Sequence, residues 1–315
     1  KKGLSRIVFQ TAASIDFKKD ILVIPVGINY SNAKKFRSKA VLDFGKPLSI
    51  LPYKEAFAVD PVKTINEFTR VLETKMKPHL VIIENPDNDK LVASIEEIFM
   101  KQWIETKSGD PKDLKQQNQA SQEIAEMVNK LSVTHPERIQ QLRLQTGNYI
   151  QKLDTFQLRD HLLDPKRIDK MNAFSFIKDV ASIYFGMPFY ALGLLFNFPP
   201  YYLAKRFSDK KIKNVEFYAS VYSNMAMLIW LVYYGIQLLL VALVFRNWPL
   251  LGMYAVAIPL LGIFAIRFGT FMKKIRGRAR LLRMVRKQRD MAAELINERK
   301  LIIEALIEAK KTAGF

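Results

Sequence analysis

The sequence predicts a layered α/β sheet domain, followed by a helical subdomain and then by a transmembrane helical hairpin. Up to about residue 100, short apolar segments typical of strands alternate with segments of helical spacing, which is the pattern of a sheet covered by helices. From about residue 111 to 170 the pattern is helical and polar, without a strand signal. Farther along, Phe217–Phe245 and Asn247–Ile266 contain no charged residue, which indicates two membrane-spanning helices.

These patterns also predict where the chain divides. The expected parts are an α/β domain at 1–103, a helical subdomain at 104–175, an interfacial or re-entrant apolar segment at 176–204, transmembrane helices at 217–245 and 247–271, and a basic and then amphipathic cytoplasmic helix at 272–315.

Local signals predict the elements of the first two parts. Asp60 is a favourable N-cap, and Pro61 suits the first position of the helix that follows it. The segments NPDND and His135-Pro136 have the turn residues that precede a helix. The expected strands are 21–30, 38–45 and 79–84, and the expected helices are 3–14, 60–76, one within 85–103, 113–131, 136–153 and, after the hairpin, 289–311.

Composition limits the chemistry of the protein. The chain has no Cys and three His, so we expect no disulfide, no thiol nucleophile and no metal site. The formal net charge of +19 predicts an anionic partner, either nucleic acid, phosphorylated metabolites or an acidic membrane surface. The strongest basic block adjoins a predicted membrane span and no nucleic-acid-binding motif accompanies it, so the charge favours lipid over nucleic acid.

The two charge-free segments are long enough to cross a bilayer. Phe217–Phe245 has about 29 residues, more than a hydrocarbon core of roughly 30 Å requires. Asn247–Ile266 has about 20, and Trp248 and Tyr254 near its start are typical of a membrane interface. Only Arg246 separates the two segments, so we expect a hairpin.

Basic residues predict the orientation of this hairpin. The segment from Arg267 to Arg289 contains ten Lys or Arg and no acidic residue, whereas the turn has only Arg246. The positive-inside rule therefore places both outer ends in the cytoplasm. The same basic segment is suited to anionic headgroups, at roughly 1 kcal/mol per cation near the surface.

A third charge-free segment, Val180–Ala204, is harder to place. If it spanned the bilayer, all preceding sequence would lie outside the cytoplasm, although Lys1–Arg37 is itself basic. Pro188 and the pair Pro199-Pro200 would interrupt a straight helix. We therefore expect an interfacial or re-entrant segment, with a true span as the alternative.

The three His residues do not form an obvious catalytic set. His79 and Glu84 are five positions apart and would point to opposite faces of a strand. His161 and Asp164 could meet on a helix as an acid and a base, but no nucleophile adjoins them. We expect a structural role for His79 and His161, and solvent exposure for His135.

Cations at the ends of the first two strands point to phosphate binding. Lys1, Lys2 and Arg37 lie near the positions where open α/β sheets bind phosphate groups. This makes these three residues candidates for a phosphate site.

Three segments, in this order, resemble the second half of the catalytic domain of the glycerolphosphate acyltransferase family: KKGLSRIVFQTA, ILVIPVGINY and KFRSKAVLDFGKPL. Enzymes of this family act in phospholipid biosynthesis, and the layout of this chain is similar to that of the members with a membrane hairpin. LVIIENPDND, YIQKLDTFQLRDHLL and LFNFPPYYLAKRF extend the resemblance to about residue 245. In that family a catalytic His-x-x-x-x-Asp motif and a Phe-Pro-Glu-Gly motif precede the Lys-Lys-Gly turn. The resemblance thus implies that 1–103 is the C-terminal half of an acyltransferase-like domain, and that this chain is a fragment which is inactive alone.

The family also implies a reaction and its participants. The complete protein would be an O-acyltransferase for glycerol 3-phosphate, its 1-acyl derivative or dihydroxyacetone phosphate. It would need no cofactor and would use acyl-CoA, acyl-carrier protein or acyl phosphate as acyl donor. The resemblance assigns no catalytic residue here, and it gives Lys1, Lys2, Gly3, Pro25 and Arg37 to the phosphate site or the acyl wall. The alternative is a non-catalytic membrane scaffold with a basic lipid-binding surface.

Overall fold

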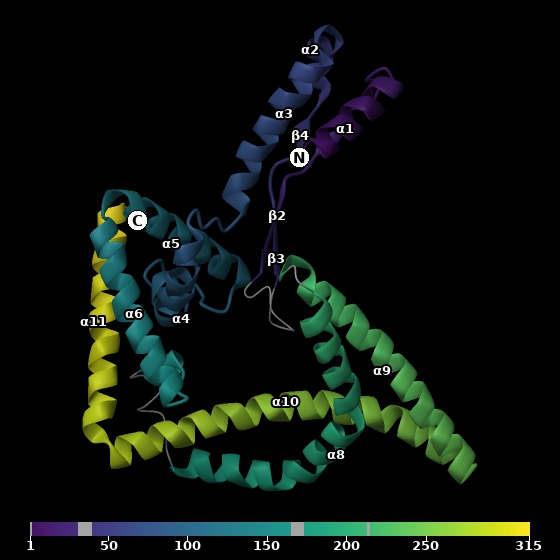
Figure 1. The fold of residues 1–315 in the computed structure, drawn as a ribbon, viewed down its shortest axis with the longest axis vertical. Coiled ribbons are helices and arrows are strands. Elements are labelled where there is room, and N and C mark those ends of the chain that lie inside the picture. Colours follow the sequence, from purple (N-terminus) through teal and green to yellow (C-terminus); the bar gives the residue numbers. More distant parts are fainter. Residues whose placement is uncertain (1, 31–39, 165–172, 213–214) are drawn as a thin grey trace. The chain divides into compact units, whose positions relative to one another are not determined.

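The computed structural model describes residues 2–30, 40–164, 173–212 and 215–315 (Figure 1). Helices dominate these residues. They form two compact units, one from the described residues within Lys1–Ser31, Lys39–Thr146 and Ile303–Phe315, and the other from those within Gly147–Ile302.

The first unit contains two small antiparallel sheets of two strands each. Strand β1 (Leu22–Val23) pairs with β4 (Leu48–Ser49), and β2 (Val26–Tyr30) pairs with β3 (Ala40–Phe44). The predicted strand at 21–30 is therefore divided, because Pro25 has no N–H to donate to a ladder. The predicted strand at 38–45 is present as β3. The large layered sheet that the sequence predicts is not seen in the described residues.

The strand predicted at 79–84 is wrong. The chain leaves a short 3₁₀ helix, η2 (Lys77–His79), and continues without strand structure. Its backbone groups are bound by side chains instead of by a neighbouring strand. The N–H of Val81 donates to Asn29 Oδ1 at 2.9 Å, and the carbonyl of Ile82 accepts from Asn129 Nδ2 at 2.8 Å. Because these groups are already paired, the apolar run needs no ladder.

Around the β1–β4 pair lies a small aromatic core. It is built by α1 (Gly3–Ser14), η1 (Leu51–Tyr53), α2 (Lys54–Val59) and α3 (Pro61–Met76). Phe9 is fully buried, with its ring 5.0 Å from that of Phe57 and 5.4 Å from that of Phe68. The predicted cap is confirmed, since Asp60 Oδ1 accepts from the N–H of Lys63 at 2.9 Å.

The rest of the first unit is helical. After η3 (Pro86–Asn88) come α4 (Asp89–Glu105), α5 (Leu114–Thr134) and the first part of α6 (Pro136–Thr155), joined by the end of α11 (Arg289–Ala313). These helices agree with the expected ones. Their shared core contains Ile95, Phe99, Trp103, Ile124 and Met127, all nearly inaccessible to solvent.

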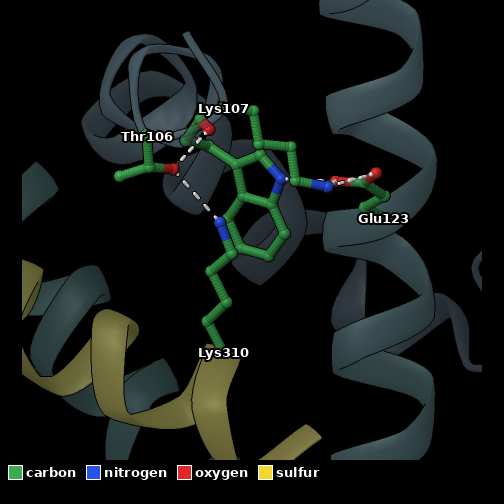
Figure 2. A network of polar contacts seen from close by, with 5 residues as sticks. Thr106, Lys107, Glu123 and Lys310 are labelled. Atoms are coloured by element: carbon green, nitrogen blue, oxygen red, sulfur yellow. Dashed lines mark hydrogen bonds and ion pairs between the residues drawn. The ribbon is translucent and has the colours of Figure 1, made fainter. Parts of the chain in front are cut away.

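A polar network joins the end of α11 to α4 and α5. The indole of Trp103 donates to Glu123 at 2.6 Å, and Lys107 pairs with the same carboxylate at 2.7 Å. Lys310 lies 4.2 Å above the indole and donates to Thr106 Oγ1 at 3.3 Å (Figure 2). Burial, together with the nearby Lys107, lowers the pKa of Lys310. The network therefore holds a cation on an aromatic face, a contact that the sequence separates by about two hundred residues.

The second unit contains three long apolar helices. They are α8 (Ala173–Lys211), α9 (Val215–Phe245) and α10 (Trp248–Lys287). Each is long and apolar enough to cross a membrane. Helix α10 does not stop near residue 271 but continues through the basic segment to Lys287. Helix α8 runs through Pro188, Pro199 and Pro200, and the ribbon shows it bent (Figure 1).

Side chains of α9 bind two backbone carbonyls that prolines leave free, one in α8 and one in α10. A proline cannot donate to the carbonyl four residues earlier, so Pro200 frees that of Phe196 and Pro259 frees that of Ala255. Gln237 Nε2 donates to the Phe196 carbonyl at 3.1 Å, and the Tyr234 hydroxyl donates to the Ala255 carbonyl. Pro200 and Pro259 therefore do not leave those two carbonyls unpaired in an apolar environment.

A buried ion pair joins the chain before α8 to the chain after α10. Asp160, in the 3₁₀ helix η4 (Asp160–Leu162), is 2% exposed and accepts two hydrogen bonds from Arg299 of α11, at 2.8 and 3.0 Å. Tyr149 of α6 donates to the same carboxylate at 2.8 Å. Nearby, Lys152 of α6 pairs with Glu294 at 2.8 Å and with Glu298 of α11. Residues on both sides of the apolar helices thus share one folded region.

Candidate functional site

The predicted phosphate residues lie at the start of α1, as far as the structure describes them. Lys2 is exposed and its carbonyl accepts from the N–H of Arg6 at 3.1 Å. No acidic residue occupies the first turn of this helix, so its N-terminal N–H groups and Lys2 offer positive potential to an anion. Lys1 and Arg37 lie outside the described residues.

Gly3 begins the same helix and faces open space. Nothing lies within 4 Å of the place where its Cβ would be. Gly3 therefore does not pack against Pro25, the other glycine-or-proline position that the resemblance assigns to the site. The backbone there is accessible to a ligand.

Pro25 lies where β1 ends and β2 begins, and it is buried. Its carbonyl accepts from the N–H of Gly45 at 2.8 Å. This bond closes the end of the β2–β3 hairpin, so Pro25 shapes a wall at that point.

Next to Pro25, the structure brings together a His and an Asp that the sequence analysis did not connect. His79 Nδ1 lies 3.0 Å from Asp43 Oδ2, and the two side chains are 23% and 34% exposed. Because 36 residues separate them, no local motif could reveal the pair. The one available signal was the alternating pattern of strand 38–45, which places Asp43 on a definite face.

Two glycines and an asparagine hold His79 in this position. A Cβ on Gly27 would lie 1.9 Å from the His79 carbonyl oxygen, and one on Gly45 would lie 2.7 Å from His79 Nε2. Asn29 Nδ2 donates to the His79 carbonyl at 2.8 Å. The segment around His79 therefore packs against the β2–β3 hairpin only because Gly27 and Gly45 have no side chain.

The geometry allows the His79–Asp43 pair to orient a proton acceptor. A neutral imidazole that donates from Nδ1 to a carboxylate keeps its lone pair on Nε2, where it can accept a hydrogen bond or a proton. The other two His residues lie elsewhere in the described chain. His135 lies between α5 and α6 with Nδ1 2.9 Å from the hydroxyl of Thr134, and His161 lies in η4.

Glu84 and Asp164, which lie near His79 and His161 in the sequence, were not expected to form catalytic pairs with them. Glu84 lies in the irregular segment after η2, where its N–H donates to Asn129 Oδ1 at 3.1 Å. Asp164 follows the short 3₁₀ helix η4, which contains His161. In the described ranges, no three His, Asp or Glu side chains gather as metal ligands would.

The comparisons with known proteins identify one distant relative. The chain is 25% identical over 214 residues to glycerol-3-phosphate O-acyltransferase 2 of Saccharomyces cerevisiae. The alignment covers 64% of this chain and 27% of the yeast protein, so the chain spans about a quarter of its relative. No family model matches the chain, and no solved structure does.

Proposed function

We propose that this chain is part of a membrane-bound acyltransferase that esterifies glycerol 3-phosphate or its 1-acyl derivative. The similarity to the yeast acyltransferase carries the proposal, and the three apolar helices support a place in the membrane. In the reaction, a glycerol hydroxyl oxygen attacks the carbonyl of an acyl thioester or acyl phosphate. A new ester bond forms, the bond to the thiol or phosphate breaks, and a general base takes the hydroxyl proton.

We assign binding of the acceptor phosphate to Lys2, together with Lys1 and Arg37. We assign the wall of the site that contacts the acyl chain to Pro25 and Gly3. The open start of α1, which lacks a first-turn acid, supports the first assignment, and the buried place of Pro25 at the hairpin end supports the second. The general base stays unassigned.

The membrane arrangement follows from a parity argument. Asp160 precedes α8 and Arg299 follows α10, yet the two form a buried ion pair in one folded region. Water-soluble sequence on both sides of the three helices must therefore lie on one side of the bilayer. An even number of crossings satisfies this condition, and we assign the two crossings to α9 and α10 and a re-entrant course to α8.

The order of contacts along α8 supports the same arrangement. Gly186 lies against Phe268 and Gly193 against Leu261, so this half approaches the α9–α10 turn. Beyond Pro200 the ring of Tyr201 lies 6.1 Å from that of Tyr222, and Asp209 accepts from Tyr218, so the second half recedes along α9. The reversal coincides with the Pro199-Pro200 pair. By the positive-inside rule, both ends of α8 face the cytoplasm.

Labelling tests this topology directly, because the chain has no Cys. Lys178→Cys and Lys211→Cys should react with a membrane-impermeant maleimide from the same side, and Arg246→Cys from the other. Opposite labelling of the first two positions would make α8 a third span.

An acyl-transfer assay tests the activity. The chain is expressed in membranes, alone and with its reading frame extended upstream, and is given labelled glycerol 3-phosphate with a mixed acyl donor pool. We expect labelled lipid from the extended protein, and a rise in the apparent KM for the acceptor in Lys2→Gln but not in Lys19→Gln, its exposed neighbour beyond α1.

A membrane scaffold is the second candidate, favoured by the exposed cations that follow the span on α10. Absence of labelled lipid from both forms of the protein would overturn the acyltransferase proposal and leave the scaffold.

A further inference from the structure

Beyond the apolar part of α10, the second unit has a hollow of about 200 Å³ with a strongly basic lining. Its cations are Arg280, Arg283 and Lys287, and no Asp or Glu is among the described residues that line it. The remaining wall is Phe156, Leu158, Met284 and Gln288. The hollow thus combines three positive charges with an apolar side.

Helix geometry explains why the three cations converge. Positions 280, 283 and 287 are separated by three and four residues, so they lie on one face of α10 over two turns. Met284, on the same face, is 6% exposed and supplies an apolar floor between them. The three cations of the hollow therefore lie together on one helix face and are not scattered surface charges.

The opposite wall comes from the way α6 ends. Gln157 has a positive φ of 51°, and the N–H of Leu158 turns back to the carbonyl of Leu153 at 2.8 Å. This turn buries Leu158, leaves Phe156 half-buried, and directs the Gln157 carbonyl to Arg280 Nη1 at 3.2 Å. Arg280 is thereby held at the rim with four further N–H groups available.

The other two cations have no counter-ion among the contacts of the described residues, and both are exposed. By contrast, Arg278, five residues before Arg283, is neutralised by Asp179 of α8 at 3.0 Å. Near that pair, α8 presents exposed Ile177 and Val180. Arg278 thus has a counter-ion close to apolar side chains of α8, whereas the hollow keeps its positive charge.

We propose that this hollow binds the phosphate group of an anionic amphiphile, with Arg280, Arg283 and Lys287 on the phosphate oxygens and Phe156, Leu158 and Met284 against the adjoining apolar part. Arginine matches a phosphate through paired N–H groups, and a lysine adds a mobile point charge. The last carbonyls of α10 oppose an anion, but one of them, that of Met284, is already bound by the N–H of Gln288 at 2.7 Å. The site uses none of the residues assigned to the acyl acceptor.

Native mass spectrometry of the whole chain in detergent tests the site without any acyl-transfer assay. The probes are phosphatidic acid, which has a phosphomonoester headgroup, and phosphatidylcholine. We expect the variant R280Q/R283Q/K287Q to bind phosphatidic acid roughly tenfold or more weakly, and phosphatidylcholine unchanged. The control K273Q/K274Q/R276Q removes the same charge from the same helix outside the hollow and should retain binding.

The outcomes separate the alternatives. Equal losses in the two triple variants would overturn the site in favour of general electrostatic attraction. Displacement of phosphatidic acid by equimolar glycerol 3-phosphate or inorganic phosphate would assign the hollow to soluble phosphates and overturn the amphiphile. The single variant R283Q, at an exposed position, should show a smaller loss with an unchanged thermal unfolding temperature, so misfolding would not be mistaken for lost binding. Retained binding in both R283Q and the triple variant would overturn the proposal.

Discussion

Two segments of this chain depart, in opposite ways, from the secondary structure that their residue composition favours. Residues 79–84 have the composition of a strand but form none, whereas α8 contains three prolines yet stays helical. In both, amide side chains bind the backbone groups. Asn29 and Asn129 replace a neighbouring strand beside 79–84, and Gln237 replaces the N–H that Pro200 lacks. A backbone group needs a partner, and a side chain from a distant element can provide it.

The largest effect should come from closing the space that the 79–84 segment uses. Gly27→Ala places a Cβ 1.9 Å from the His79 carbonyl oxygen, so η2 and β2 must separate. We expect a loss of roughly 3 kcal/mol in the free energy of unfolding. The control is Gly3→Ala, where the Cβ meets nothing, and urea unfolding measures both. Similar losses in the two variants would show that the Gly27 contact is not what matters.

Removal of the asparagine is the next test. Asn29→Ala removes two part-buried hydrogen bonds, to the His79 carbonyl and from the Val81 N–H, and should cost about 2 kcal/mol. Asn129→Ala also removes two bonds, but they are exposed, and water can replace them. Chemical unfolding of the two variants measures the difference. A larger cost for Asn129→Ala would contradict the role given to Asn29.

In the apolar bundle a double-mutant cycle isolates the equivalent contact. Gln237→Leu should cost about 1 kcal/mol because the Phe196 carbonyl loses its donor. Pro200→Ala restores the backbone donor to that carbonyl, so the cost of Gln237→Leu should fall in this background. Unfolding in mixed micelles measures all four proteins. Strict additivity would mean that Gln237 does not compensate for the proline.

The smallest effect on stability should come from Glu96, because a hydrogen bond offsets only part of the cost of burying its carboxylate. Burial raises the pKa of Glu96 above 4.5, although a hydrogen bond with Ser121 partly opposes this. Because the unfolded chain ionises at lower pH, the stability of the protein should fall as the pH rises from the ordinary pKa towards the raised pKa of the folded state. Glu96→Gln should therefore stabilise the protein at pH 7, by less than about 1 kcal/mol. Thermal unfolding at pH 4 and pH 7 should show the gain only at the higher pH.

Helices were predictable from local signals, either a cap or the spacing of apolar residues. Asp60 and Pro61 define the start of α3, and Gly3–Ser14 forms α1 with the predicted limits. Strands were less predictable, because a strand needs a partner that local pattern does not identify. Pro25 divides one predicted strand, and 79–84 finds side chains in place of a neighbour.

The candidate site divides in a similar way. Lys2, Gly3 and Pro25 were chosen from the sequence, and the structure gives each a definite setting without bringing Gly3 to Pro25. The His79–Asp43 pair was missed because its members come from a strand and a 3₁₀ helix that only folding brings together. The basic hollow on α10 was missed in part. Its charges were evident, but the turn at Gln157 that closes it was not.

By itself, the sequence determined the apolar helices, the basic segment after them and the capped helices, since these depend on composition and on neighbours within a few residues. The tertiary structure alone decided which chain segments meet. It placed Asp160 with Arg299 and Lys310 on Trp103, and it gave the proline-freed carbonyls their donors. Such contacts join residues far apart along the chain, and their stability depends on burial that no local pattern records.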